Sequence, residues 1–198
     1  MNRIKISREI TKILRHTAMI LKLDINDQGY VKLDDLINHV SKKYPLDSLT
    51  FDLFNSIVES DQKNRFKLIQ LNNDWYIRAN QGHTMGLKPE LLLTKITNHL
   101  EIPYCIHGTY KNKLPLIKEN GLSKMNRDQI HMTTNRFDPS LKHVPGIRHS
   151  INTIIRINVE LAMDDGIEFY VSDNGVILSP GNENGFIPSK YFMEINHI

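Results

Sequence analysis

The sequence lacks the features that mark secreted, disulfide-linked and membrane-spanning proteins. Its 198 residues include a single cysteine, Cys105, which excludes an internal disulfide and any cysteine-based zinc cluster. The apolar surroundings of this cysteine favour a buried side chain over a nucleophile. No apolar run approaches the roughly 18 residues of a membrane-spanning helix, and the start, MNRIKISREI, has no apolar signal core. We therefore expect a cytoplasmic protein that does not bind membranes.

Several motifs that bind metals or nucleotides are also missing. The nine histidines include no HExxH pair and no cluster with carboxylates at ligand spacing, so we expect no metal site. There is no GxxxxGK[ST] and no GxGxxG after a predicted strand, which excludes a P-loop and a Rossmann dinucleotide site. The formal net charge of +3 permits an anionic substrate such as nucleic acid but does not require one.

The first 88 residues have the pattern of three helices followed by a β-hairpin. The run SREITKILRHTAMILKL predicts a helix capped by Ser7. Further helices are predicted over 31–44 and over 50–60, the latter opened by Thr50. The β-rich runs RFKLIQL and DWYIRAN, separated by NND, predict a hairpin. This order of elements is typical of a winged helix. The first helix has one apolar stripe, which we expect to be buried: Ile10, Ile13, Leu14, Thr17, Ile20 and Leu21.

From about residue 102 onward the pattern changes to short strands. The segment GLKPELLL is the expected linker, and DNG predicts a hairpin turn between the last two strands. One helix, NKLPLIKENGL, is expected to end at Gly121 in a left-handed cap. We therefore predict an α+β chain with two domains, 1–88 and 89–198, of which the second is mostly β. Its expected strands lie in YCIHGT, QIHMTT, NTIIRINV, EFYVS and VILSP.

Two stretches of the first domain offer polar side chains for an anion. Arg15 and His16 are adjacent on the non-core side of the first helix, where they form either a solvated surface or a site that binds phosphate and shares a proton. Arg78 ends the second hairpin strand, and Gly82 in the following loop lets the backbone approach a ligand. Trp75 alternates to the opposite face of that strand, where we expect it to pack in the core rather than stack on a base.

Two stretches of the second domain are also candidates. His107, Gly108 and Thr109 end a predicted strand, where backbone amides can hold a ligand, although a hydrogen-bonded structural histidine fits equally well. Arg148 follows a Pro-Gly turn and precedes a strand, so it is better fixed than an arginine on a free loop. By itself it is also compatible with an ordinary surface position.

Taken in order, the motifs resemble those of the RNA 2′-phosphotransferases, the KptA-like family. The resemblance spans nearly the whole chain. It implies a winged-helix RNA-binding lobe, 1–88, and a lobe similar to ADP-ribosyltransferases that binds NAD, 89–198, with the active site in the cleft between them. The stretches that carry it are ILRHTAMILKLDINDQGYVKLDDLI, YIRANQGHT, IHGTYKNKLPLIKENGL, QIHMT, GIRHSINTIIRINV and GVILSPGNENGFIPSKYF.

The resemblance also implies a reaction and a partner. Enzymes of this family remove an internal RNA 2′-phosphate, such as one left in a tRNA by splicing, with NAD⁺ and without a metal. The phosphate displaces nicotinamide to form RNA-2′-phospho-ADP-ribose. A ribose hydroxyl then attacks that phosphate. The products are 2′-OH RNA, ADP-ribose 1″,2″-cyclic phosphate and nicotinamide.

The family motifs assign roles to residues of this sequence. Three planar guanidiniums suit a phosphate that carries nearly two negative charges, and histidine suits proton movement. Gln129 stands where the family commonly has the first histidine of His-x-His. The implied catalytic residues are Arg15, His16, Arg78 and Arg148, the implied NAD-binding residues are His107, Gly108, Thr109 and His131, and the residues expected to contact the RNA backbone are Gln81 and His83.

Two other function classes remain open. An ADP-ribosyltransferase that modifies a nucleic-acid end or a protein would share the cofactor and stop after the first step. A non-enzymatic winged-helix protein would bind nucleic acid through a basic third helix, but TFDLFNSIVES is acidic, which counts against it.

Overall fold

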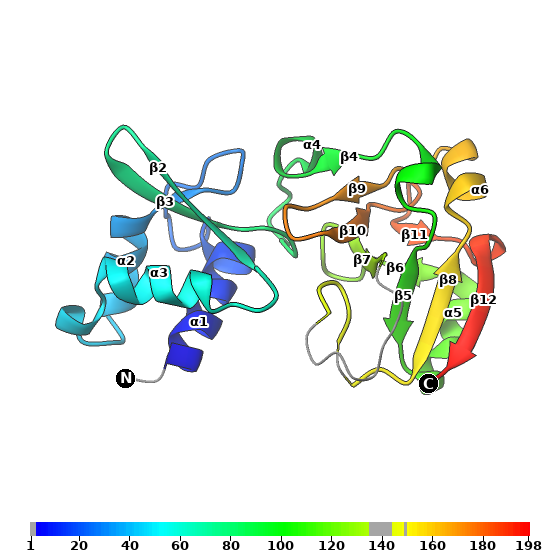
Figure 1. Cartoon of the computed structure of the whole chain (residues 1–198), viewed down its shortest axis with the longest axis horizontal. Coiled ribbons are helices and arrows are strands. Elements are labelled where there is room, and N and C mark those ends of the chain that lie inside the picture. The colour runs from blue at the N-terminus through cyan, green and yellow to red at the C-terminus, as the bar shows by residue number, and fades with distance from the viewer. Residues whose placement is uncertain (1–2, 135–143, 149) are drawn as a thin grey trace. The chain divides into compact units, whose positions relative to one another are not determined.

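The computed structural model describes residues 3–134, 144–148 and 150–198 (Figure 1). The chain forms two compact units, Met1–Leu92 and Leu93–Ile198. The division lies a few residues beyond position 88, at which the sequence places the end of the first domain. Each unit has a hydrophobic core of its own.

The first helix of unit 1 changes its geometry part-way. α1 (Arg3–Lys12) passes directly into a π-helical turn, η1 (Ile13–Thr17). Ser7 lies inside α1, so its predicted role as the N-cap is wrong. The helix starts earlier because Ile6, which is fully buried, adds one more turn to the apolar side of the helix.

The predicted apolar stripe of this helix is buried only in its first half. Ile10, Ile13 and Leu14 are at most 1% exposed, whereas Ile20 is 77% exposed, so its predicted burial is wrong. A π-helical turn contains more residues than an α-helical turn, and it therefore changes the direction of the side chains that follow. The helix also ends at Thr17, before Ile20 is reached.

The rest of unit 1 follows the predicted order. α2 (Leu33–Ser41) and α3 (Phe51–Glu59) confirm the second and third helices, and the Thr50 side chain accepts a hydrogen bond from the Leu53 N–H at 3.3 Å as the predicted cap. The helices pack on the hairpin of β2 (Phe66–Leu71) and β3 (Asp74–Ala79) (Figure 1). A short strand, β1 (Val31–Lys32), pairs with the other edge of β3.

The hairpin turn and the core side of β3 also agree with the sequence. Asn72 and Asn73 have φ values of 50° and 68°, the left-handed conformation that a two-residue hairpin turn needs. Trp75 is half-buried, and its ring centroid lies 4.7 Å from that of Phe51. Trp75 is therefore a packing residue, as predicted.

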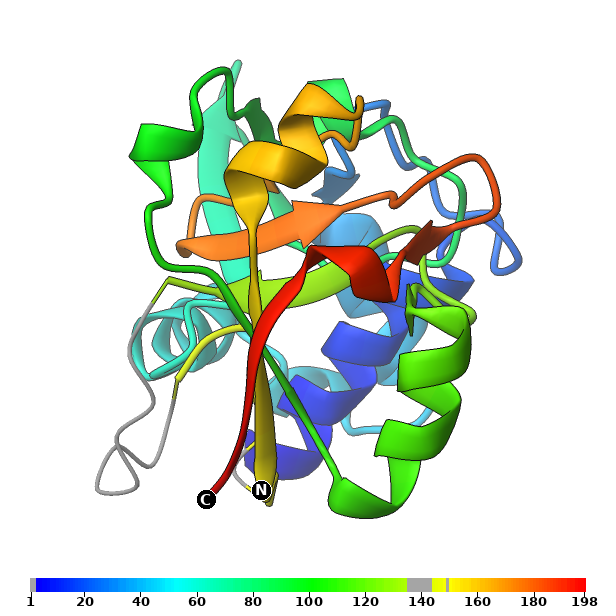
Figure 2. The ribbon, with the colours of Figure 1, turned by 90° about the vertical axis from the view of Figure 1, so that its right-hand side faces the viewer.

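Unit 2 is built around a seven-stranded antiparallel sheet with the order β12-β8-β5-β7-β10-β9-β4. The five predicted strands are confirmed. The last strand, which lies alongside β8 in Figure 2, was not predicted. The sheet strands are β4 (Thr94–Lys95), β5 (Ile106–Thr109), β7 (Ile130–Thr133), β8 (Thr153–Ile157), β9 (Tyr170–Val171), β10 (Val176–Ser179) and β12 (Phe192–His197).

Shorter elements complete both units. A second sheet of unit 2 pairs two short strands, and α6 is a helix that the sequence pattern did not predict. These elements are η2 (Leu46–Ser48) and α4 (Pro89–Leu92) in unit 1, and η3 (His99–Glu101), η4 (Lys111–Lys113), α5 (Leu114–Asn120), β6 (Leu122–Ser123), α6 (Val159–Asp164), β11 (Phe186–Ile187) and η5 (Ser189–Tyr191) in unit 2.

The end of α5 differs from the expected left-handed cap. Gly121 has φ 90° and ψ −179°, so its φ is positive but its backbone is extended rather than helical. A Cβ atom at this position would lie 2.5 Å from the Ile187 carbonyl oxygen. Only glycine fits here, because both the conformation and the close approach of β11 exclude a side chain.

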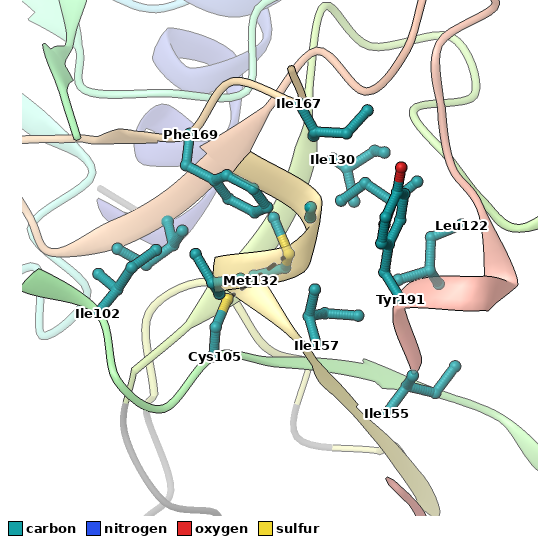
Figure 3. Packing of buried hydrophobic residues seen from close by; sticks show 14 of the residues in the cluster. Ile102, Cys105, Leu122, Ile130, Met132, Ile155, Ile157, Ile167, Phe169 and Tyr191 are labelled. Atoms are coloured by element: carbon teal, nitrogen blue, oxygen red, sulfur yellow. Dashed lines mark hydrogen bonds between the residues drawn. The ribbon is translucent and has the colours of Figure 1, made fainter. Parts of the chain in front are cut away.

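Cys105 lies in the core of unit 2 beside Met132 (Figure 3). Its thiol donates to the Met132 sulfur at 3.7 Å, and burial raises the pKa of the thiol to about 12. The thiolate is therefore not populated at neutral pH, and the prediction of a buried, unreactive cysteine is confirmed. The chain is an α+β protein, as predicted, while the winged-helix and ADP-ribosyltransferase-like descriptions of its units stay predictions.

Candidate functional site

Arg15 and His16 of unit 1 lie in the π-helical turn, and both are half-buried. The Ala18 N–H closes this turn by donating to the Ile13 carbonyl at 2.9 Å. Single π-helical turns inside α-helices are frequent at functional sites. The turn therefore contains both residues of the sequence motif.

The loop after β3 is attached to this turn. The Thr84 N–H donates to the Arg15 carbonyl at 3.0 Å, and the Thr84 hydroxyl oxygen lies 3.0 Å from His16 Nδ1. Gly82 has φ 87°, and a Cβ atom there would lie 3.3 Å from the guanidinium carbon of Arg15. The absence of a side chain at Gly82 lets the guanidinium lie against the loop backbone, while the predicted approach of this loop to a ligand stays a prediction.

Arg78 is held from two directions. It is only 6% exposed, and its Nη1 donates to the Gln28 carbonyl oxygen at 3.2 Å. Its guanidinium carbon lies 5.0 Å from the ring centroid of Tyr30. Arg78 is therefore a buried, oriented cation at the end of β3 rather than a solvated surface residue.

His83 lies among the cations of unit 1. It is 5% exposed, and a Cβ atom at Gly29 would lie 3.6 Å from its Nε2. Burial, and after it the positive charges of Arg15, Arg78 and His16, together lower the pKa of His83 to about 3. His83 is therefore neutral at physiological pH, and it reports a concentration of positive charge that suits an anion.

The neighbours of His83 in the loop are buried as well. Gln81 is 8% exposed and Asn80 is 4% exposed, and the Asn80 amide donates to the Asn64 carbonyl at 2.7 Å. Asn80 therefore anchors the loop to the residues before β2. Because both side chains are buried, Gln81 and His83 can contact an RNA backbone only if its phosphate enters this loop. Their predicted RNA-binding roles stay predictions.

In unit 2 the two predicted histidines are both fixed by backbone carbonyls. His107 Nδ1 donates to the His131 carbonyl at 2.8 Å, and His131 Nδ1 donates to the Gln129 carbonyl at 3.1 Å. Because a carbonyl only accepts, each imidazole carries its hydrogen on Nδ1. Burial lowers the pKa of His107, and the charges of Arg148 and Arg127 lower it further, against the hydrogen bond to His131, which raises it.

Gly108 supports the loop that carries Arg148. A Cβ atom at Gly108 would lie 2.7 Å from Ile151 Cδ1 and 3.0 Å from Ile147 Cγ2. Both isoleucines are buried in one cluster with Ile106, whereas Arg148 between them is exposed. The loop is thus anchored on β5 with its arginine outward, in agreement with the expectation that Arg148 is fixed in place. Thr109, 7% exposed, ends β5 opposite Thr153.

Arg148 has neighbours that the sequence reasoning missed. The Tyr110 hydroxyl lies 2.7 Å from Ser150 Oγ, and these hydrogen bonds from Ser150 and from Arg148 lower the pKa of Tyr110. Burial and the charge of Arg148 lower the pKa of Arg127. Their positions in the sequence offered a signal, since Tyr110 directly follows IHGT and Arg127 stands two residues before Gln129.

The described residues therefore contain two groups of candidates, one in each unit. Arg15, His16, Arg78 and His83 gather in unit 1, while His107, His131 and Arg148 belong to unit 2. That the two groups form a single active site stays a prediction. Within the described residues, no group of His, Cys, Asp and Glu side chains is arranged to hold a metal ion. No helix in this part of the chain is long and apolar enough to span a membrane.

The family described as RNA 2′-phosphotransferase, Tpt1 / KptA family, matches residues 1–181. The chain belongs to this family. The resemblance that the motifs indicated is thereby confirmed over both units.

Curated relatives carry the same activity in their names. The proteins named tRNA 2′-phosphotransferase 1 of Danio rerio and Mus musculus are similar, with 34% identity over 197 residues and 35% over 195. These matches cover 96% of this chain in both cases and 83% and 76% of the respective relatives. A Schizosaccharomyces pombe relative, whose name includes tRNA 2′-phosphotransferase, is 39% identical over 190 residues, and the chain spans about half (50%) of its length.

Proposed function

We propose that the protein is an NAD⁺-dependent RNA 2′-phosphotransferase that acts on RNA with an internal 2′-phosphate, including tRNA from splicing, in the cytoplasm. In this proposal unit 1 is a winged-helix lobe that binds the RNA, and unit 2 is an ADP-ribosyltransferase-like lobe that binds NAD⁺. In this proposal residues of both units contribute to one active site. The main support is the gathering of Arg15, His16 and Arg78 around one buried histidine in a chain of this family.

The chemistry of the unit 1 cluster suits a phosphomonoester. A 2′-phosphate carries nearly two negative charges at neutral pH, and guanidiniums match its oxygens in a planar, bidentate way. The guanidiniums of Arg15 and Arg78 supply the positive charge for this contact. In the proposed reaction they bind the 2′-phosphate, while His16, held by Thr84, moves a proton at the ribose hydroxyl or at the RNA 2′-oxygen.

The residues of unit 2 fit a dinucleotide in two respects. The Nδ1–H form of His107 keeps Nε2 as its hydrogen-bond acceptor, which suits a ribose hydroxyl. Gln129 is 8% exposed, and its amide nitrogen has no hydrogen-bond partner among the described residues, so a buried donor is available for a ligand oxygen. NAD⁺ would supply the ADP-ribosyl group to which the phosphate becomes bonded, and nicotinamide would be the leaving group.

The finer course of the reaction is part of the proposal. It passes through RNA-2′-phospho-ADP-ribose and yields 2′-OH RNA, ADP-ribose 1″,2″-cyclic phosphate and nicotinamide. In the second step the Arg148 guanidinium stabilises negative charge on the phosphoryl oxygens. Positioned cations give this stabilisation without a metal ion. The alternative of an ADP-ribosyltransferase that stops after the first step is not favoured, because the names of the family and of its relatives describe phosphotransferases.

The test uses an RNA oligonucleotide with one internal 2′-phosphate and the same RNA with a 2′-OH as the control. With NAD⁺ the first RNA should lose its phosphate and release the cyclic ADP-ribose phosphate, whereas without NAD⁺ it should stay unchanged. Phosphate that persists under both conditions would refute the transferase. Stable ADP-ribosylated RNA without the cyclic product would instead support the alternative.

A further inference from the structure

Tyr30 lies across from Arg78 in the sheet of unit 1. The register pairs Val31 with Ile77 and Lys32 with Tyr76, so Tyr30 and Arg78 are the next positions along the two strands. Side chains at such positions share one face of the sheet and are close enough to interact. The guanidinium carbon of Arg78 lies 5.0 Å from the Tyr30 ring centroid, which is the geometry of a cation–π contact.

The loop that carries Tyr30 is closed by its own hydrogen bonds. The Asn26 side-chain oxygen accepts from the Gln28 and Tyr30 N–H groups at 3.0 and 2.9 Å. The Asn26 N–H donates to the Tyr30 carbonyl at 3.0 Å, and an isolated bridge joins Ile25 to Val31. This closed loop also presents the Gln28 carbonyl that accepts from Arg78 Nη1 at 3.2 Å. The guanidinium is thus held by a ring and by a carbonyl of the same loop.

Packing in the hydrophobic core of unit 1 does not account for the burial of Tyr30. The side chain is 6% exposed, yet in the described part of unit 1 it does not belong to the hydrophobic core cluster. Its ring lies against the Arg78 guanidinium instead. An arginine that is oriented before its ligand arrives loses less conformational freedom on binding, and a misplaced guanidinium no longer meets two phosphate oxygens at once.

We propose that Tyr30 is a positioning residue, which holds the guanidinium of Arg78 in the orientation that binds the RNA 2′-phosphate. This inference rests on the proposed function and deepens it. It assigns the loop Asn26–Tyr30 to the substrate site, although its side chains need not touch the phosphate. Tyr30 acts through its aromatic face, so phenylalanine should replace it and an aliphatic side chain should not.

The test is a double-mutant cycle on the full chain with a binding readout. The measured quantity is the ratio of affinities for an RNA oligonucleotide with one internal 2′-phosphate and for the same RNA with a 2′-OH. Tyr30→Leu should lower this preference by about 3- to 30-fold, and Tyr30→Phe should keep it. In an Arg78→Ala background, Tyr30→Leu should cause no further loss, because the two residues act as one unit.

Tyr44→Leu is the matched control. Tyr44 packs against the hydrophobic core of unit 1, and the Lys43 amine lies 5.8 Å from its ring, but it belongs to neither candidate group. It should leave the preference for the 2′-phosphate unchanged. If Tyr30→Leu does not fold, as judged by thermal unfolding, Tyr30→Met takes its place in the cycle, because its flexible, unbranched side chain adapts to the space of the ring without an aromatic face.

The outcomes separate this inference from the function on which it rests. A wild-type protein without any preference for the 2′-phosphate would overturn both. A wild-type preference that Tyr30→Leu retains, or that Tyr30→Leu and Arg78→Ala lower additively, would overturn the positioning role alone. The inference is supported if Tyr30→Leu lowers the preference for the 2′-phosphate and Tyr30→Phe keeps it, and if Tyr30→Leu causes no further loss of that preference in the Arg78→Ala background.

Discussion

His16 Nδ1 and the hydroxyl oxygen of Thr84 lie 3.0 Å apart, although 68 positions separate the two residues in the sequence. The Thr84 N–H also donates to the carbonyl of Arg15, again at 3.0 Å. One threonine thus joins the loop after β3 to both members of the Arg-His pair. It fixes the orientation of the imidazole.

Thr84→Val should lower kcat for 2′-phosphate removal by roughly 5- to 30-fold, which corresponds to about 1–2 kcal/mol for a lost orienting hydrogen bond. Valine keeps the shape of threonine but has no hydroxyl group. Thr84→Ser, which keeps it, is the control and should remain near wild type. Steady-state kinetics with saturating NAD⁺ measure the effect, and equal rates for the valine and serine variants would contradict it.

Gly82→Ala should displace the Arg15 guanidinium and lower kcat/KM by about tenfold, in addition to a loss of about 1 kcal/mol in stability from the positive φ. A Cβ atom at Gly82 lies 3.3 Å from the Arg15 guanidinium carbon. Gly86→Ala is the matched control, because Gly86 also has a positive φ, 71°, but nothing within 4 Å of its Cβ position. If both variants lose activity equally, contact with Arg15 is not the cause.

His83 should make unit 1 less stable as the pH falls. Its pKa is about 3 when folded, against 6.5 as the ordinary value. Between these values the unfolded chain binds a proton that the folded chain excludes, so the free energy of unfolding decreases toward acid pH. From pH 7.5 to 5.0 the contribution of this one group is about 2 kcal/mol.

Urea unfolding at both pH values, compared between wild type and His83→Gln, measures this contribution. The variant should lose less stability toward pH 5.0 than the wild type does. His107, whose pKa is also lowered, contributes in the same direction, but it is present in both proteins and cancels in the comparison. The same loss in both proteins would show that His83 does not carry the effect.

Gln129→Leu should raise KM for NAD⁺ by roughly 5- to 30-fold, because it removes a buried donor that has no partner among the described residues. Gln129→His, which restores the residue common in the family, should stay close to wild type. Affinity for the 2′-phosphorylated RNA alone serves as the control and should not change. An unaltered KM for NAD⁺ in Gln129→Leu would exclude Gln129 from the cofactor site.

His16→Ala and Arg148→Ala should both accumulate ADP-ribosylated RNA, since the proposed roles of these residues lie in the second step. Gel analysis of the RNA after a single turnover detects this species. Arg8→Ala is a control for the loss of one positive charge, because Arg8 is exposed on α1. If both variants leave the RNA untouched while still binding NAD⁺, the assignment to the second step is wrong.

Much of the fold was predictable because its signals are local. Three signals each determine the structure of residues only a few positions away. They are the apolar spacing of α2, the hydroxyl of Thr50 and the Asn72-Asn73 turn, and all three have the predicted structure. The strand β12 has no comparable signal. It is mostly exposed at the edge of its sheet and is defined by pairing with β8, far away in the chain.

The sequence supplied the candidate residues of the site but not their geometry. The sequence alone indicated the family and the candidate residues, because each residue stands in a short contiguous motif. These candidates are Arg15, His16, Arg78 and Arg148, together with the glycines in the same motifs. Only the tertiary structure revealed the π-helical turn, the contact of Tyr30 with Arg78 and the support of the Arg148 loop by Gly108. These relationships depend on which distant segments pack together, and long-range packing leaves no regular period in the sequence from which it could be predicted.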